Sequence, residues 1–345
     1  MPPYVQLLHD TLHRSLIDWR IVGRVTIDML PDVVLLVLFD FYLDKALVEA
    51  WYTLVHVCQK WRSVVFGSPR RLKLRLHCTE RTRVKETLDV WPPLPIVIRT
   101  LYPQDWGMDN IIAALEHNDR ISQLDLIYIP SSQMRKVLEA MKRPFPELTY
   151  LRLLLRDEST PVGPAFGSFL GGSAPNLQEL FLYRISFSRL PNLLSSATRL
   201  VRLSLRDIPH SGYFSPEAIA RCLSALTSLE ALFIGFKSRR SRPHRSRRHP
   251  PPRTRTLLPV LTLLLFKGVC EYLEDLVAQI DAPLLDKFYI TFFPQQVFDI
   301  PQLMQFLGRT PKFKEARGVT FDRDVSVTLP QISDGTLKLE ILPNH

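Results

Sequence analysis

Two histidines near the start of the chain have the spacing of a metal site. His9 and His13 lie four residues apart, and side chains with this spacing meet on one face of a helix. Zinc proteases built on such a pair place a glutamate directly after the first histidine, where it acts as the general base. Asp10 follows His9 instead. We therefore expect a surface or packed histidine pair and no metal ligands.

The other patterns that support catalysis are missing from the sequence. The segment 163–172 (GPAFGSFLGG) holds four glycines without either phosphate-binding pattern, GxxxxGKS/T or GxGxxG, so we expect a turn there. No GxSxG occurs, and scattered single Ser, His and Asp residues do not indicate a triad. The sequence predicts no catalytic residues, no cofactor-binding residues and no enzymatic activity.

The four cysteines also give no sign of a chemical site. They lie far apart, and no CxxC pair occurs, so neither a disulfide framework nor a zinc ribbon is indicated. We expect buried thiols at Cys58, Cys78, Cys222 and Cys270.

Leucine spacing organises most of the chain into repeated units. An apolar-x-x-apolar-x-apolar pattern occurs seven times, and its first positions are separated by 27, 29, 23, 29, 29 and 27 residues. The occurrences are Ile121/Leu124/Leu126, Leu148/Leu151/Leu153, Leu177/Leu180/Leu182, Leu200/Leu203/Leu205, Leu229/Leu232/Ile234, Leu258/Leu261/Leu263 and Leu285/Phe288/Ile290. Weaker units flank the seven triples. Before the triples stand Leu72, Leu74, Leu76 and Ile96, Ile98, and after them stand Phe313, Val319 and Phe321. Each unit predicts a short strand whose alternate apolar residues point inward.

Helices are expected between these strands. Residues 132–141 (SQMRKVLEAM) read as a helix that stops before Pro144. Residues 216–226 (PEAIARCLSAL) begin with Pro216 in the first turn, and Ser215 precedes them as the N-cap.

This pattern resembles the leucine-rich-repeat family over residues 71–345. The resemblance implies an α/β solenoid in which parallel strands form a concave face, helices return on the convex face, and stacked neighbours complete the core. The asparagine that the family usually carries three residues after the third leucine is missing, so we expect an irregular array. That position holds Ile129, Arg156, Ile185, Ile208, Lys237, Phe266 and Phe293.

Residues 29–70 have a helical period instead. An apolar helix is expected through Leu38 and Phe39, and a second helical face is formed by Leu54, Val57, Cys58, Trp61 and Val65. The segment resembles the F-box motif, with Leu-Pro, a short apolar helix, Val-Cys, Trp-Arg and a downstream proline at Leu30-Pro31, Val34/Leu35/Leu38, Val57-Cys58, Trp61-Arg62 and Pro69. It departs from the motif at Val33, where an acid often stands, and in a slightly longer loop at 44–50.

Together the two segments resemble a fungal, basidiomycete-type F-box protein with C-terminal leucine-rich repeats. The resemblance implies a non-catalytic substrate receptor that docks on the Skp-type adaptor of a cullin ubiquitin ligase. The family positions of the adaptor surface fall on Leu30, Pro31, Val34, Leu35, Leu38, Val57, Cys58 and Trp61. Two alternatives stay open: an interaction scaffold whose F-box-like segment is only a structural cap, and an RNA-binding protein that uses its arginines.

The net charge of +10 comes from one place. Residues 237–255 (KSRRSRPHRSRRHPPPRTR) hold nine Lys and Arg and no acid; without them the 44 basic residues fall to 35, against 34 acidic ones. The stretch has too little apolar area to order itself, so we expect a disordered, solvated loop, with nuclear import as the second interpretation. It lacks the aromatic residues that stack on bases, and nucleic acid is not an expected partner.

A target-binding site is expected on the concave face. The residue between the last two apolar positions of each unit points outward, which gives the row Asp125, Arg152, Phe181, Ser204, Phe233, Thr262 and Tyr289. Aromatic and arginine side chains dominate interface hot spots. The candidates for contact with an unknown protein target are Phe181, Tyr183, Arg206, Phe233 and Tyr289.

The chain start predicts neither export nor membrane anchoring. MPPYVQLLHD lacks the basic flank and the apolar block of a secretory signal, and no apolar run approaches the roughly 20 residues of a membrane span. Val5, Leu8, Leu12, Leu16 and Trp19 fall on one helical face, so residues 1–28 are expected to pack as a helix beside the F-box-like segment. We expect a cytoplasmic or nuclear protein, or both.

Overall fold

The structure is a computed structural model that divides into two compact units, Met1–Leu74 and Arg75–His345. It describes residues 29–45, 50–67, 73–76, 78–81, 83–90, 93–100, 107–156, 169–186, 190–241, 243, 254–293, 299–313, 326–328 and 336–341. The N-terminal extension predicted at 1–28, together with His9, His13 and Pro69, lies outside these residues. In the described ranges, no helix is long and apolar enough to cross a membrane.

The first unit contains three helices in its described part: α2 (Asp32–Lys45), α3 (Ala50–Val57) and α4 (Gln59–Gly67). Each of the three contacts the other two. The second helical face predicted from the sequence is divided between α3 and α4, because the helix breaks at Cys58. The Cys58 carbonyl accepts from the Arg62 amide at 3.1 Å, so α4 begins immediately after the break.

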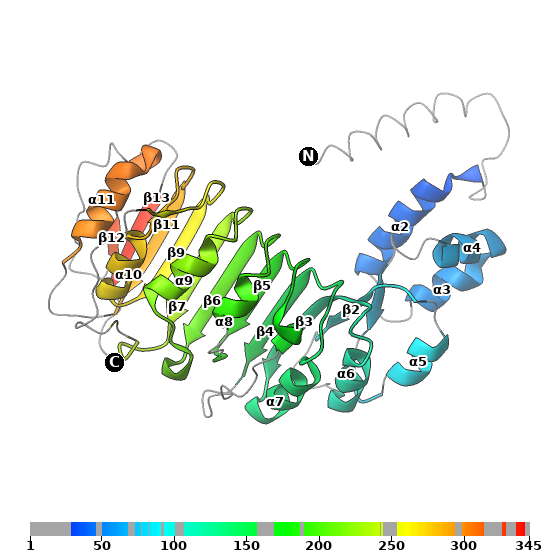
Figure 1. Ribbon diagram of the computed structural model, residues 1–345. Coiled ribbons are helices and arrows are strands. Elements are labelled where there is room, and N and C mark those ends of the chain that lie inside the picture. Colours follow the sequence, from blue (N-terminus) through cyan, green and yellow to red (C-terminus); the bar gives the residue numbers. More distant parts are fainter. Residues whose placement is uncertain are drawn as a thin grey trace, which may run out of the picture. The chain divides into compact units, whose positions relative to one another are not determined.

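The second unit is an α/β structure built on an open, mostly parallel sheet (Figure 1). The eleven strands lie in the order β1-β2-β3-β4-β5-β6-β7-β9-β11-β13-β12, and only β12 is antiparallel to its neighbour in the registers described. A separate two-stranded sheet pairs β8 (Thr256–Leu257) with β10 (Ile280–Asp281). The strands of the large sheet are β1 (Leu74–Leu76), β2 (Ile96–Arg99), β3 (Ile121–Ile129), β4 (Tyr150–Leu155), β5 (Glu179–Tyr183), β6 (Arg202–Ile208), β7 (Ala231–Phe236), β9 (Leu263–Gly268), β11 (Lys287–Phe292), β12 (Ser326–Thr328) and β13 (Thr336–Ile341).

Helices follow most of the strands and lie in front of the sheet in the view of Figure 1. The two helices predicted from the sequence are present with slightly different ends, and the Ser215 hydroxyl accepts from the Ala218 amide at 3.2 Å as the expected N-cap. The described part of the glycine-rich segment, Phe169–Gly172, is a short 3-10 turn. The helices are α5 (Val84–Val90), α6 (Met108–Leu115), α7 (Ser131–Ala140), α8 (Leu190–Leu194), α9 (Pro216–Leu223), α10 (Cys270–Val277) and α11 (Pro301–Arg309).

The strands alternate buried and half-buried side chains, as their leucine pattern predicts. β4 and β5 both follow this alternation along their whole length. Buried residues point toward the helices: Leu182 of β5 and Leu205 of β6 line a small apolar pocket together with Leu190 of α8. The half-buried residues lie on the opposite surface of the sheet, which we call the open face. Of the seven predicted apolar triples, every member except Leu263 is buried.

The sixth triple is corrected by the strand register. β7 pairs with β9 so that Leu232 faces Leu264 and Ile234 faces Phe266, which makes the triple Leu261/Leu264/Phe266 and not Leu258/Leu261/Leu263. Leu263 is therefore half-buried on the open face, and Leu265 takes the place predicted for Thr262. The nearly continuous apolar run at 257–266 allows several registers, so alternation alone could not choose among them.

The strands predicted for the weaker flanking units are confirmed before the seven triples, but not at Phe313 after them. Leu74 and Leu76 lie on β1, and Ile96 and Ile98 lie on β2, all buried. Phe313 belongs to a 3-10 turn (Pro311–Phe313) and not to a strand. Leu72, Val319 and Phe321 lie outside the described residues.

A buried glutamate fixes the start of α11. Glu274 of α10 is 6% exposed, and its two carboxylate oxygens accept from the backbone amides of Gln302 and Leu303, each at 2.8 Å. These amides belong to the first turn of α11, where backbone donors have no partner within the helix. Burial raises the pKa of Glu274, and the two amide donors oppose that shift.

Replacing Glu274 by Ala is expected to lower the free energy of unfolding by about 1–3 kcal/mol, because two backbone donors lose their partners in a buried place. Urea denaturation followed by circular dichroism measures the change. Glu139→Ala, at an exposed position on α7 that pairs with Lys142, is the matched control and should cost less than about 0.5 kcal/mol. Equal stability of the two variants would contradict the capping role.

Candidate protein-binding surfaces

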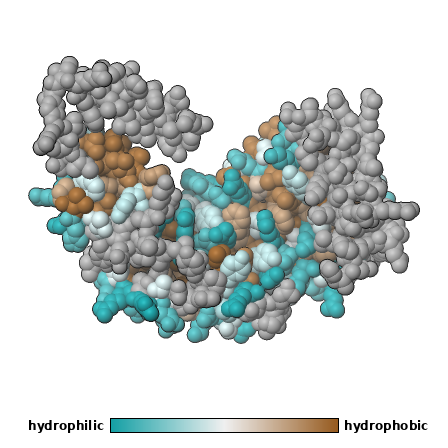
Figure 2. Space-filling model, turned by 180° about the vertical axis from the view of Figure 1, so that it is seen from behind, coloured by the Kyte–Doolittle hydropathy of each residue, from teal (hydrophilic) through white to brown (hydrophobic). Residues whose placement is uncertain are grey.

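The middle row of the open face runs across eight strands. Its residues stand opposite one another in the parallel register: Arg99, Asp125, Arg152, Phe181, Ser204, Phe233, Leu265 and Tyr289. The space-filling view from behind shows polar and apolar side chains mixed over this part of the molecule (Figure 2). The open face therefore carries both charged and aromatic side chains within reach of a ligand.

On β2 to β5 the charged and aromatic side chains of the open face already contact one another. The Arg152 guanidinium donates to both carboxylate oxygens of Asp125, at 2.7 and 2.6 Å. Arg99 donates to the Gln123 side chain at 3.2 Å, and the rings of Tyr150 and Phe181 lie 5.6 Å apart between centroids. Because these groups contact one another, this part of the face carries little net charge.

The next strands hold an arginine in a fixed orientation. The Arg206 guanidinium lies over the Phe233 ring, 4.3 Å from its centroid, and Arg206 Nε donates to the Ser204 hydroxyl at 3.1 Å. A Cβ at Gly235 would come within 2.8 Å of the Phe233 ring, so this glycine makes room for the ring to lie along β7. In the described part of the chain, no carboxylate pairs with Arg206, whose residue is exposed.

An acidic residue lies beside this stack. Asp207 pairs with Lys267 at 3.2 Å and with Arg184 at 3.7 Å, and the Arg184 guanidinium lies 4.8 Å from the Tyr183 ring centroid. Burial, followed by the neighbouring Asp207 carboxylate, raises the pKa of Tyr183. We call the set of Tyr183, Arg184, Arg206, Asp207, Phe233 and Lys267 the carboxyl-end cluster, because it lies at the carboxyl ends of β5, β6, β7 and β9.

Backbone conformation explains how two members of this cluster reach each other. Arg184 and Asp207 have φ of 62° and 48°, in the left-handed region that residues with a Cβ rarely occupy. Both stand two residues after the third apolar position of their unit, as does Tyr128, which has φ of 58°. The β6 register shifts between Leu205 and Ile208, so the bulge turns Asp207 toward Lys267.

The five residues predicted for target contact all lie outside the core. Phe181, Tyr183, Phe233 and Tyr289 are half-buried on the open face, and Arg206 is exposed. The structure brings Tyr183, Arg206 and Phe233 into one cluster, whereas Phe181 packs on Tyr150 and Tyr289 lies on β11. Their role in target binding stays a prediction. Sequence reasoning missed Arg184, Asp207 and Lys267. Two of them, Arg184 and Asp207, take a left-handed backbone conformation that their residue types do not predict.

The first unit exposes an unusual number of large apolar side chains. On α2, Val33, Val37 and Phe41 follow one another every four residues, with Leu38 and Tyr42 beside them, and all are at least 42% exposed. The opposite side of α2 is buried through Leu35, Leu36 and Phe39. A helix that is apolar on every side normally has a partner on each.

The eight residues predicted for adaptor binding take up three kinds of position. Pro31, Leu38 and Val57 are exposed, Leu30, Val34, Cys58 and Trp61 are half-buried, and Leu35 is fully buried. The Lys60 ammonium donates to the Leu30 carbonyl at 2.8 Å, and the Trp61 ring lies 4.7 Å from that of Phe39. α4 therefore holds the start of α2 in place. Adaptor binding itself stays a prediction.

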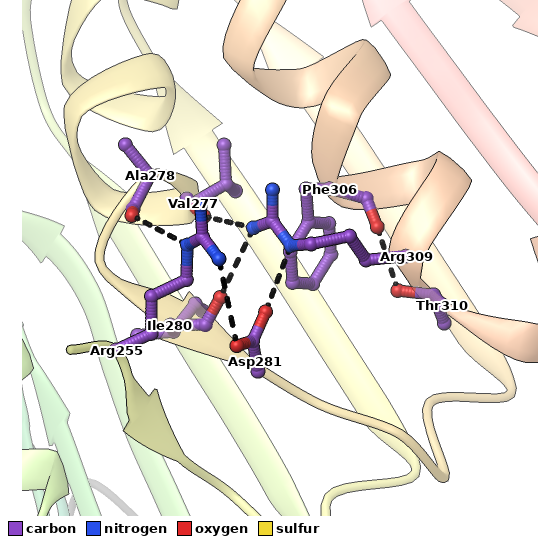
Figure 3. Close-up of polar contacts among 8 residues, drawn as sticks. All are labelled: Arg255, Val277, Ala278, Ile280, Asp281, Phe306, Arg309 and Thr310. Carbon is purple, nitrogen blue, oxygen red and sulfur yellow. Dashed lines mark hydrogen bonds and ion pairs between the residues drawn. The ribbon is translucent and has the colours of Figure 1, made fainter. Parts of the chain in front are cut away.

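The ends of the basic stretch are folded, which corrects the boundaries predicted for the disordered loop at 237–255. Ser241 is 1% exposed, and Arg255 Nε donates to the Ala278 carbonyl at 3.2 Å. Figure 3 shows Arg255 and Arg309 reaching the same carboxyl end of α10, with the Asp281 carboxylate between them. Residues 242 and 244–253 lie outside the described residues.

Replacing residues 244–252 by a Gly-Ser linker of equal length is expected to change the free energy of unfolding by less than about 0.5 kcal/mol, because the segment has no large apolar side chain to bury. Arg255→Ala should cost about 1 kcal/mol, because the α10 carbonyl loses its donor. Thermal unfolding of both variants measures the difference. A larger loss in the linker variant would show that the replaced segment is packed.

No catalytic arrangement stands out among the described residues. None of their His, Cys, Asp and Glu side chains form a group of three that could hold a metal ion. None of the four cysteines, which all lie in the described part of the chain, forms a disulfide. Cys78, Cys222 and Cys270 are buried as predicted, whereas Cys58 is half-buried. Burial raises the pKa of the Cys78 thiol to about 12, which keeps it protonated and a poor nucleophile.

Comparison with known proteins adds no family assignment. The chain matches no protein-family model, and no curated protein matches it.

Proposed function

We propose that the protein is a non-catalytic substrate receptor of a cullin ubiquitin ligase. In this proposal residues 29–70 are an F-box-like segment that docks on a Skp-type adaptor. Residues 71–345 form an irregular leucine-rich-repeat solenoid whose open face captures a target protein. The partners would carry out the chemistry, transferring ubiquitin to a lysine of the captured protein.

The exposed apolar side of α2 is the observation that carries the proposal. Five large apolar side chains on one helix of a small unit are costly to leave in water, and such patches mark interaction sites. The Leu-Pro pair and the Val-Cys and Trp-Arg pairs on the neighbouring helices match the F-box pattern residue by residue. The patch and the motif therefore favour the same kind of partner.

The open face supports the second half of the proposal. Its aromatic and arginine side chains are held by neighbours before any ligand arrives, so little side-chain freedom would be lost on binding. The three acidic residues Asp125, Glu179 and Asp207 are interleaved with the cations along the face. This mixture suits a protein surface better than a continuous phosphate backbone.

The scaffold alternative has one observation in its favour. Leu35, Leu54, Val55, Val64 and Val65 form a small buried core in the first unit, as a structural cap would require. A cap alone does not account for the exposed residues of α2, and for that reason it ranks second.

Affinity purification of the full chain from fungal cells, followed by mass spectrometry, tests the proposal. Recovery of a Skp-type adaptor and a cullin supports the receptor function. Recovery of other proteins without them supports the scaffold, and partners that disappear on nuclease treatment support RNA binding.

A further inference from the structure

The carboxyl-end cluster has a charge that the rest of the open face lacks. The described residues 183–186, 206–208, 235–241 and 265–268 contain six Lys and Arg but one acid, Asp207. The Lys237 amide donates to the Ile208 carbonyl at 2.9 Å, which places the start of the basic stretch at the end of β6. This edge of the sheet is therefore strongly positive, although the chain outside 237–255 is nearly neutral.

Arg206 is built to receive an anion. Its Nε is occupied by the Ser204 hydroxyl and its plane is fixed against Phe233, while its terminal nitrogens have no partner in the described part of the chain. A guanidinium held in this way offers parallel N–H donors with the geometry of a carboxylate. Because the orientation is fixed beforehand, binding loses little entropy.

The aromatic rings of the cluster are not available for stacking on bases. The Phe233 ring lies close to Gly235 with the Arg206 guanidinium over it, and the Arg184 guanidinium lies near the Tyr183 ring. Single-stranded nucleic acid is bound through open aromatic faces together with a basic groove. Here the rings hold cations instead, which favours recognition of acidic side chains.

The geometry points to an extended, Asp/Glu-rich segment of the target protein as the ligand of the carboxyl-end cluster, with Arg206 as its anchor. This inference rests on the target-binding half of the proposed function and names the chemistry of the target. Arg206 and Lys267 lie on strands two steps apart, or about 10 Å, and β5 lies one step further. An extended chain that crosses these strands presents side chains on one side every ~7 Å, which lies between one strand step and two. The long Arg and Lys side chains can span the difference, so acids at alternate positions come within their reach.

Fluorescence anisotropy with the full chain tests this inference. The probe is a fluorescein-labelled ten-residue peptide of alternating Glu and Ser; the comparison probes are the same peptide with Gln in place of Glu and a ten-nucleotide oligouridine. We expect binding of the Glu peptide that weakens with salt, and much weaker binding of the Gln peptide.

Matched arginine variants separate a specific site from general charge. Arg206→Ala should weaken binding of the Glu peptide about tenfold or more, and Arg206→Lys should not restore it, since lysine lacks the planar donor pair. Arg202→Ala removes the same charge from the same strand, but Arg202 already faces Glu179 at 3.9 Å, so the effect should stay within about twofold. Thermal unfolding shows that each variant folds.

Phe233 acts in this site as a positioning residue. Phe233→Leu should weaken peptide binding in the wild type but add nothing in the Arg206→Ala background, because the ring acts through the guanidinium. Additive losses in the double variant would contradict that role.

Three results would overturn the inference: no binding of the Glu peptide, equal losses for Arg202→Ala and Arg206→Ala, or tighter Arg206-dependent binding of oligouridine. The last result would assign the site to RNA. Adaptor capture depends on α2 and is measured in a separate co-purification experiment. Failure of the docking proposal and failure of this inference can therefore be told apart.

Discussion

Replacing Leu38 by Asp is expected to abolish co-purification of the Skp-type adaptor while the protein stays folded. Leu38 is 48% exposed on α2, so a polar side chain is accommodated in the free protein. In a complex, the change would remove an apolar contact worth roughly 2 kcal/mol or more and leave a carboxylate buried without a partner. The two effects together should reduce capture by more than about a hundredfold.

A matched control exists in the second unit. Leu284 is 55% exposed, so Leu284→Asp makes the same change in another exposed place and should leave adaptor capture unchanged. The double variant Leu30→Ala/Pro31→Ala should lose capture as Leu38→Asp does, because both residues lie directly before α2, in the Leu-Pro pair proposed for adaptor docking. Adaptor recovered at wild-type yield with both variants would reject docking and favour the structural cap.

The leucine pattern was sufficient to predict most of the sheet. Six of the seven apolar triples have the predicted register, because a slip by one residue would turn Leu151 or Leu180 out of the core. The pattern failed where apolar residues follow one another without alternation, before and within β9. There the register depends on pairing with β7 and β11, which are distant in the sequence.

The same alternation could predict only some residues of the carboxyl-end cluster. Arg206 and Phe233 occupy strand positions whose direction follows from alternation, so they could be predicted to lie on the open face. Asp207 could not, because alternation ends at the bulge where it takes a left-handed conformation. Its partner Lys267 lies 60 residues further along the chain, and the correct register of β9 is needed to bring the two together.

The positions of β7 and β9 in turn depend on an aromatic cluster behind them. Tyr272 of α10 is fully buried, and its ring centroid lies 4.6 Å from that of Phe236 at the end of β7 and 5.9 Å from that of Phe266 on β9. The Tyr213 ring centroid lies 6.0 Å from that of Tyr272. These contacts join α10 to the two strands that carry Phe233 and Lys267.

Replacing Tyr272 by Ala is expected to lower the free energy of unfolding by about 3–5 kcal/mol, the usual cost of deleting a fully buried aromatic ring. The loss arises from apolar area returned to water and from the cavity left between α10 and the sheet. Urea denaturation measures it. Tyr150→Ala, which deletes the same side chain from the half-buried open face, should cost clearly less.

Replacing Tyr272 by Phe should have the opposite outcome. The Tyr272 hydroxyl is buried and has no hydrogen-bond partner in the described part of the chain, and burial raises its pKa well above the ordinary value, so it stays neutral and unpaired. Removing an unpaired buried hydroxyl while keeping the ring should leave the free energy of unfolding unchanged or raise it by about 1 kcal/mol. If Tyr272→Phe destabilised the protein as much as Tyr272→Ala does, the hydroxyl and not the ring would hold the cluster together.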